Sequence, residues 1–154
     1  MTDQRAQDVG RMLEAMKCGR RFSRDELEVL GDFMAVQQFR KGQTILLQGE
    51  KGNSMAFVVA GLVEIIKDRT KTSDAVVVTL GPGNHFGELS LIDGEPRSAS
   101  AVAVEDTTLL TMSREQFDAL RASRPELGFK FYEQIAILVS KRLRLTTREL
   151  VYRI

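Results

Sequence analysis

The spacing of apolar and polar residues divides the chain into three parts, of which the first is helical. Met12, Leu13 and Met16 recur at the spacing of one helix face. A second helix is expected to begin at Ser23, because the sequence SRDE places a glutamate three residues after a serine, the signature of a capping box. Residues 1–35 are therefore predicted to form N-terminal helices.

Over residues 36–112 the pattern changes to short apolar runs of the length of β-strands. The runs are TILLQ, MAFVVA, LVEIIK, AVVVTL, SASAVAV and TTLLTM. Glycines at positions 42, 49, 52, 61, 81, 83 and 94 break them. Short strands separated by glycine turns favour a β-sandwich or barrel.

The helical pattern returns over residues 113–154. Ser113 and Gln116 repeat the capping-box signature, and Pro125 suits the first turn of a long final helix. Two overlapping apolar rows make this helix apolar over a wide arc, so one partner surface is not expected to cover it. The rows are Tyr132, Ile135, Val139, Leu143, Thr146 and Leu150, and Phe131, Ile135, Leu138, Arg142 and Leu145. No repeat or linker interrupts the chain, and we predict one domain over residues 1–154.

Composition adds limits on function. With 43% hydrophobic and 28% charged residues the chain should fold, and 22 basic against 21 acidic residues leave no global field to attract a polyanion or an acidic membrane. Two basic clusters, Lys17 to Arg21 and Lys141 to Arg144, are expected to be solvated helix faces, because no aromatic residues alternate with them. The chain also lacks a secretory signal and any apolar run of about twenty residues, so we expect a cytoplasmic protein without membrane contact.

The sequence contains one cysteine and one histidine, too few for a multi-ligand metal site. Cys18 is expected to be a partly buried structural thiol, with a redox role as the alternative. His85 is expected in a turn or strand. Neither a metal cluster nor a Ser/His pair is present to activate water or a nucleophile, so we expect a protein that is not an enzyme and that needs no cofactor.

The segment GPGNHFGELSL, followed by Arg97 and Ser98, carries the candidate chemistry. Its glycines precede ELSL, which could form one helical turn whose first N–H groups bind an anion. Arg97 offers a charged fork for phosphate, while Glu88 would repel phosphate and should instead accept a hydrogen bond from a neutral hydroxyl such as that of ribose. Phosphate and ribose together indicate a nucleotide. The alternative is an internal Glu88–Arg97 ion pair that closes a surface loop.

The stretch FGELSLIDGEPRSASA closely resembles the phosphate-binding cassette of cyclic nucleotide-binding domains. ILLQGEKGNSMAFVVAGLVEI and SREQFDAL extend the resemblance over residues 22–150. It implies a mainly β fold, a jelly-roll-like β-roll over residues 36–112 with flanking N-terminal helices and a long C-terminal helix. It further implies that Glu88 binds the ribose 2′-hydroxyl and Arg97 the cyclic phosphate. The remaining cassette residues implied to bind ligand through amides or hydroxyls are Gly87, Leu89, Ser90, Ser98 and Ala99.

The segment KRLRLTTRE is similar to the part of the C-terminal helix that contacts the base in this family. The match places Thr146 at the base-contacting position with Thr147 as its neighbour, and it implies a homodimer through this helix. Ser98 favours cyclic AMP over cyclic GMP, and both remain open.

We therefore expect a sensor that binds a cyclic nucleotide and signals by moving its C-terminal helix. The alternative is a β-roll that has lost its ligand and serves as a dimerisation or docking module. Because the sequence ends at VYRI, near the end of the long helix, we expect no helix-turn-helix and no direct DNA binding. The downstream protein partner is left open.

Overall fold

The structure is a computed structural model that describes residues 2–67 and 76–153. The N-terminal part contains two α-helices separated by a short 3-10 helix: α1 (Thr2–Glu14), η1 (Lys17–Arg21) and α2 (Arg24–Asp32). The predicted capping box at the start of α2 is confirmed, since the Ser23 hydroxyl accepts from the Glu26 amide and the Glu26 carboxylate accepts from the Ser23 amide.

Eight antiparallel strands follow and form two four-stranded sheets. The first sheet has the order β1 (Ala35–Phe39), β8 (Thr107–Ser113), β3 (Ser54–Ala60) and β6 (His85–Phe86). The second has the order β2 (Thr44–Leu46), β7 (Ser100–Ala103), β4 (Val63–Lys67) and β5 (Val76–Leu80). One short helix, α3 (Glu88–Asp93), lies between β6 and β7 in the chain. The predicted β-roll with flanking helices is confirmed.

Alternation along β3 lets one strand serve two cores. Met55 and Phe57 face a cluster shared with the helices, while Ala56 and Val58 face a second cluster between the two sheets. Successive strand residues point to opposite faces, so a strand covered on both sides reads as a continuous apolar run, as MAFVVA does. The β-roll therefore has one core between its two sheets and a second core between the first sheet and the helices, called the helix-side core below.

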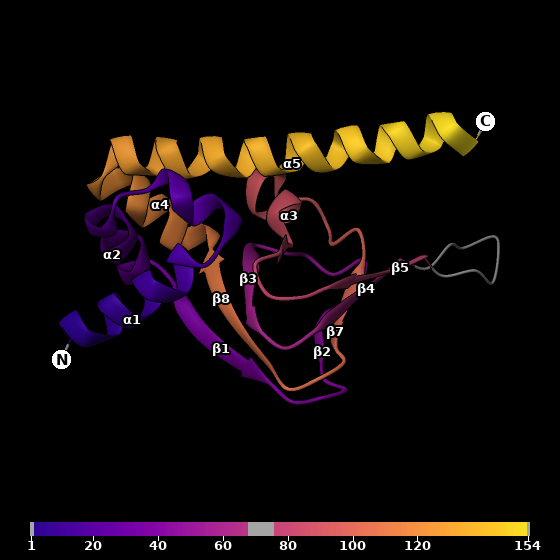
Figure 1. The fold of residues 1–154 in the computed structure, drawn as a ribbon, viewed down its shortest axis with the longest axis horizontal. Coiled ribbons are helices and arrows are strands. Elements are labelled where there is room, and N and C mark those ends of the chain that lie inside the picture. Colours follow the sequence, from indigo (N-terminus) through magenta and orange to yellow (C-terminus); the bar gives the residue numbers. More distant parts are fainter. Residues whose placement is uncertain (1, 68–75, 154) are drawn as a thin grey trace.

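Two helices complete the chain, α4 (Arg114–Ser123) and α5 (Pro125–Arg153). The second capping box, Ser113 with Gln116, is confirmed at the start of α4. Figure 1 shows α5 running along one side of the whole molecule, over α4 and then over α3. Phe131 and Ile135 are buried in the helix-side core, whereas Leu143 and Leu145 are more than half exposed. The helix is thus anchored at its beginning, and its later turns carry uncovered apolar side chains.

Within residues 2–67 and 76–153, no helix has both the length and the apolarity that crossing a membrane requires.

Cys18 lies in the helix-side core, as expected for a structural thiol, and burial raises its pKa to about 11. Because the thiolate is the reactive form, iodoacetamide at pH 8 should modify Cys18 about a hundredfold more slowly in the folded protein than in urea. Mass spectrometry of timed samples measures both rates. Equal rates would contradict the burial and favour the redox alternative.

Candidate functional site

Arg97 is buried among neutral partners. Its side chain donates from Nη1 to the carbonyl oxygens of Ser54, at 2.8 Å, and Gly87, at 2.9 Å, and from Nη2 to the Ser54 hydroxyl at 3.0 Å. Among the described residues, no carboxylate lies within ion-pair distance of it. Burial lowers the pKa of Arg97 and the nearby charge of Glu88 raises it, but a guanidinium stays protonated in proteins. A buried cation held only by neutral groups is suited to receive an anion.

The Arg97 side chain occupies space that is open because two neighbouring residues are glycines without a Cβ atom. Gly87 caps the start of α3 in the left-handed conformation, at φ 79°, and a Cβ there would stand 2.9 Å from Nη1 of Arg97. A Cβ on Gly52 would overlap the Arg97 side chain. The backbone of Arg97 is also fixed. Its amide donates to the backbone carbonyl of Glu50 at 2.8 Å, and its carbonyl accepts from the backbone amide of Gly49 at 2.9 Å. The glycine-rich turn before β3 therefore holds Arg97 from both backbone and side chain.

Glu88, the first residue of α3, is 3% exposed. Its Oε1 accepts from Nη1 of Arg142 at 2.9 Å, and its Oε2 lies 3.2 Å from Nδ1 of His85. Burial by itself raises the pKa of Glu88, but the contact with His85 and the charge of Arg142 bring it below its usual value. The carboxylate is therefore ionised at neutral pH and remains a strong acceptor.

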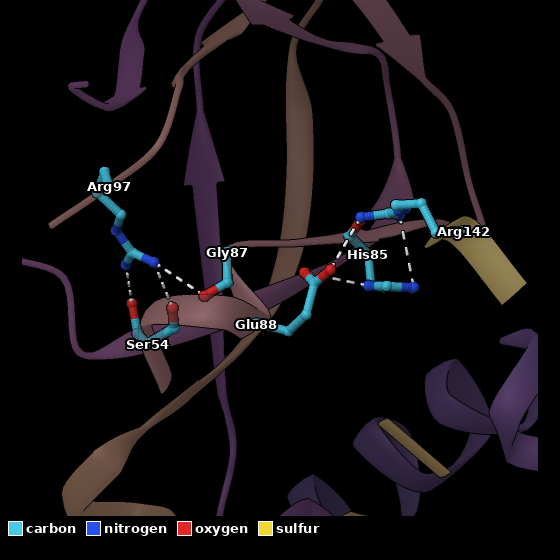
Figure 2. A network of polar contacts seen from close by, with 6 residues as sticks. All are labelled: Ser54, His85, Gly87, Glu88, Arg97 and Arg142. Carbon is cyan, nitrogen blue, oxygen red and sulfur yellow. Dashed lines mark hydrogen bonds and ion pairs between the residues drawn. The ribbon is translucent and has the colours of Figure 1, made fainter. Parts of the chain in front are cut away.

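Arg142 reaches this carboxylate from α5. Besides Glu88 it contacts His85 twice, donating from Nη2 to the backbone carbonyl at 2.9 Å and lying 3.4 Å from ring Nε2. Figure 2 shows the two groups of contacts side by side, with Arg97, Ser54 and Gly87 in one and Glu88, His85 and Arg142 in the other. The C-terminal helix is thus joined to the site through side chains.

Glu88 and Arg97 do not form the internal ion pair that was the alternative at the sequence level. The two side chains bind different partners and line the same cavity, which has a volume of about 210 Å³. Apolar side chains from β4, β5 and α3, among them Ile65, Val78 and Leu89, form another part of its wall. A cation, a carboxylate and an apolar wall in one cavity can accommodate an anion, a hydroxyl and a flat apolar group together.

The structure brings most of the predicted site residues to this cavity. Those that line it are Gly87, Glu88, Leu89, Ser90, Arg97, Ser98 and Ala99. The hydroxyl of Ser90 already donates to the carbonyl of Glu95 at 2.9 Å, so it closes the end of α3. The side chain of Leu89 is 48% exposed at the rim.

Thr146 and Thr147 lie elsewhere, exposed on α5 beyond Arg142. The Thr146 hydroxyl donates to the carbonyl of Arg142 at 3.0 Å, within its own helix. In the part of the chain that the structure describes, α5 contributes Arg142 to the cavity wall and neither threonine. The structure does not show their predicted contact with the base, which stays a prediction.

Three residues of the site were missed by the sequence reasoning: Ser54, His85 and Arg142. Arg142 was assigned to a solvated basic face, and its side chain is 44% exposed, but the contact with the buried Glu88 was not foreseen. A usable signal existed, since Arg142 is the one charged residue in the row Phe131, Ile135, Leu138 and Leu145. Ser54 gave no such signal. It binds the Arg97 side chain only because the fold places the start of β3 beside Arg97.

Residues 36–124 match the family described as "Cyclic nucleotide-binding domain". The chain is similar to the Cyclic AMP receptor protein of Thermus thermophilus, with 35% identity over 126 residues that make up 82% of this chain and 56% of that protein. The chain spans about half the length of the first curated relatives it matches.

Solved structures are similar as well. A cyclic nucleotide-binding domain from Methylobacillus flagellatus has a TM-score of 0.85 and 27% identity, over 99% of this chain and 85% of that chain. The Catabolite Activator Protein of Thermus thermophilus has a TM-score of 0.76 and 34% identity, over 86% of this chain and 61% of that chain.

The lowered pKa of Glu88 predicts an acid-sensitive contribution to stability. Glu88→Gln should lower the free energy of unfolding by about 1 to 3 kcal/mol at neutral pH, because it weakens charge-assisted hydrogen bonds. A carboxylate whose pKa is lower in the folded state stabilises fully above its ordinary value of 4.5 and loses that effect as the pH falls through its folded value. The difference between wild type and variant in urea unfolding should therefore shrink below about pH 4.5. A constant difference down to pH 3 would contradict the assignment.

Proposed function

The chain belongs to the cyclic nucleotide-binding domain family, and we propose that it is a sensor that binds cyclic AMP in preference to cyclic GMP. The observation that carries the proposal is the placement of Glu88 and Arg97 on one cavity wall without an ion pair between them. The name of the Thermus relative, a cyclic AMP receptor, supports the choice of nucleotide.

In this proposal each chemical part of the ligand contacts a different part of the cavity wall. The cyclic phosphate lies against the guanidinium of Arg97, where charge and planar geometry suit two phosphate oxygens. The ribose 2′-hydroxyl donates to the carboxylate of Glu88. The base lies along the apolar wall that includes Ile65 and Val78. Ser98 beside Arg97 supports cyclic AMP, as in the family resemblance above.

The proposed output is the position of α5. A ribose hydroxyl and the guanidinium of Arg142 would share the carboxylate of Glu88, so occupancy of the cavity changes the contact that joins α5 to the roll. A ligand can shift such an equilibrium only by its different affinity for the two positions. Leu143 and Leu145, exposed on the later turns of α5, support a homodimer through this helix.

We also propose that the protein is not an enzyme. Of the polar side chains at the cavity, Arg97 and Arg142 are permanent cations, and Glu88 is ionised and engaged by His85 and Arg142. This arrangement is suited to holding a nucleotide, and none of these groups is free to activate a water molecule.

Titration by calorimetry with cyclic AMP and cyclic GMP tests the binding proposal. Wild type should bind cyclic AMP more tightly than cyclic GMP. Arg97→Ala should weaken binding by about 2 to 5 kcal/mol, roughly thirtyfold to several thousandfold, because the phosphate loses its charge partner. The variant also loses its hydrogen bonds to Ser54 and Gly87, so thermal unfolding should be measured alongside.

Arg121→Ala is the matched control, since this arginine is about half exposed and pairs with Asp118 on α4. It should bind cyclic AMP as wild type does. If wild type binds neither nucleotide at millimolar concentration, the ligand-free interaction module becomes the better description. If Arg97→Ala binds within about threefold of wild type, the phosphate assignment is wrong.

Removal of the residues after Arg144 tests the role of the end of α5. Binding should persist but weaken, since the loss of one or two neutral hydrogen bonds from Thr146 and Thr147 costs about 0.5 to 1.5 kcal/mol each. The preference for adenine over guanine should fall. Sedimentation at micromolar concentration should show a weaker dimer than the full chain, because Leu145 is also removed. A truncated chain with an unchanged dimer and base preference would contradict both roles.

A further inference from the structure

His85 lies at the centre of the polar contacts of the ribose side of the site and has a chemistry of its own. It is the sole histidine of the sequence, lies in β6, and is 6% exposed. Its ring packs edge-on against Phe57, with ring centroids 6.4 Å apart, so its orientation is fixed by the core. Figure 2 shows the ring beside both the carboxylate of Glu88 and the guanidinium of Arg142, which also contact each other.

The contact with Glu88 determines the state of one ring nitrogen. Nδ1 lies 3.2 Å from Oε2 of Glu88, within ion-pair distance, and both atoms are buried and make no hydrogen bond among the described residues. An ionised carboxylate can only accept hydrogen bonds. The contact is favourable only if Nδ1 carries a hydrogen.

The contact with Arg142 determines the state of the other ring nitrogen. Nη2 of Arg142 lies 3.4 Å from Nε2, and it also donates to the backbone carbonyl of His85 at 2.9 Å. A guanidinium has donors and no acceptor. Nε2 therefore has to present its lone pair to Arg142. A hydrogen on Nε2 would point at another donor, and with Nδ1 also protonated it would place a second cation beside the guanidinium.

We propose that His85, held as the neutral Nδ1–H tautomer, is a positioning residue that fixes Glu88 for the ribose hydroxyl and that Arg142 of α5 selects this tautomer. The inference rests on the proposed function, since it uses the ribose role of Glu88. With Oε1 bound by Arg142 and the His85 ring 3.2 Å from Oε2, the carboxylate has a defined orientation and still has lone pairs for a hydroxyl.

Apart from Glu88, the charged groups beside the ring of His85 are cations. Arg21 from η1 and Lys141 from α5 line a groove along the ring together with Cys18, whose raised pKa keeps it uncharged. The charge of Arg97 interacts with that of Glu88 across the cavity. Glu88 is thus the one negative charge among these lining groups, and Arg142 already binds it directly.

Nitrogen NMR of protein labelled with ¹⁵N in the histidine ring reads this state without any nucleotide. One labelled imidazole gives one pair of ring signals. At neutral pH wild type should show a protonated Nδ1 and a lone pair on Nε2. Arg142→Ala should move the ring towards the Nε2–H form that imidazole prefers in water. A wild-type ring with Nε2–H, or an Arg142→Ala spectrum equal to that of wild type, would overturn the proposal.

Cyclic AMP affinity of three variants at His85 provides the second measurement. His85→Phe keeps the flat ring but has no donor, and should bind about tenfold more weakly. His85→Asn places an amide donor near the position of Nδ1 and should bind within about threefold of wild type. His85→Gln places its amide near Nε2 and should behave like the phenylalanine variant.

Thermal unfolding of each variant separates a loss of fold from a loss of position. Equal affinity in all three variants would overturn the positioning role, as would failure of asparagine to restore binding in a folded protein. If wild type binds no cyclic nucleotide, the proposed function fails, while the tautomer measured in the free protein still decides whether His85 and Arg142 are coupled as stated.

Discussion

The site depends on the burial of one permanent positive charge, that of Arg97. Removing a guanidinium from water is costly unless its donors find acceptors, and here the acceptors are the carbonyls of Ser54 and Gly87 and the Ser54 hydroxyl. These neutral groups satisfy hydrogen bonds without neutralising the charge. The glycines at positions 52 and 87 follow from the same constraint, because a side chain at either would collide with Arg97. The start of β3 and the cap of α3 are therefore built around this one side chain.

The negative charge of the site is arranged differently. Glu88 is also buried, but a cation from α5 pairs with it and an imidazole ring from β6 lies beside it. Had Glu88 paired with Arg97, the two charges would have neutralised each other inside the cassette. Pairing with Arg142 keeps Arg97 without a direct counter-ion and connects the roll to a helix that begins 37 residues further along the chain than α3 does. The same contact that satisfies Glu88 thus joins the site to α5.

Much of this architecture could be predicted from local sequence. The two capping boxes, the strands with their glycine turns and the cassette residues Glu88 and Arg97 depend on neighbours within a few positions, so their patterns are readable in the chain. The partners Ser54 and Arg142 could not be read in this way, because 43 and 54 residues separate them from Arg97 and Glu88. His85 was expected in a turn or strand and is found in β6, but its contacts arise only when α3 and α5 meet.

The sizes of the individual contacts limit how the proposed movement of α5 could be driven. The Arg142 side chain is 44% exposed, so its ion pair with Glu88 stabilises one helix position by only about 1 kcal/mol. A shift of a two-state equilibrium from 1:99 to 99:1 requires about 5.5 kcal/mol of differential affinity, which this pair cannot supply alone. Covering Leu143 and Leu145, which are 64% and 58% exposed, would add about 1 to 2 kcal/mol for each side chain. If α5 moves as proposed, apolar burial along its later turns would supply most of the energy difference, and the ion pair with Glu88 would fix the position of the helix along the roll.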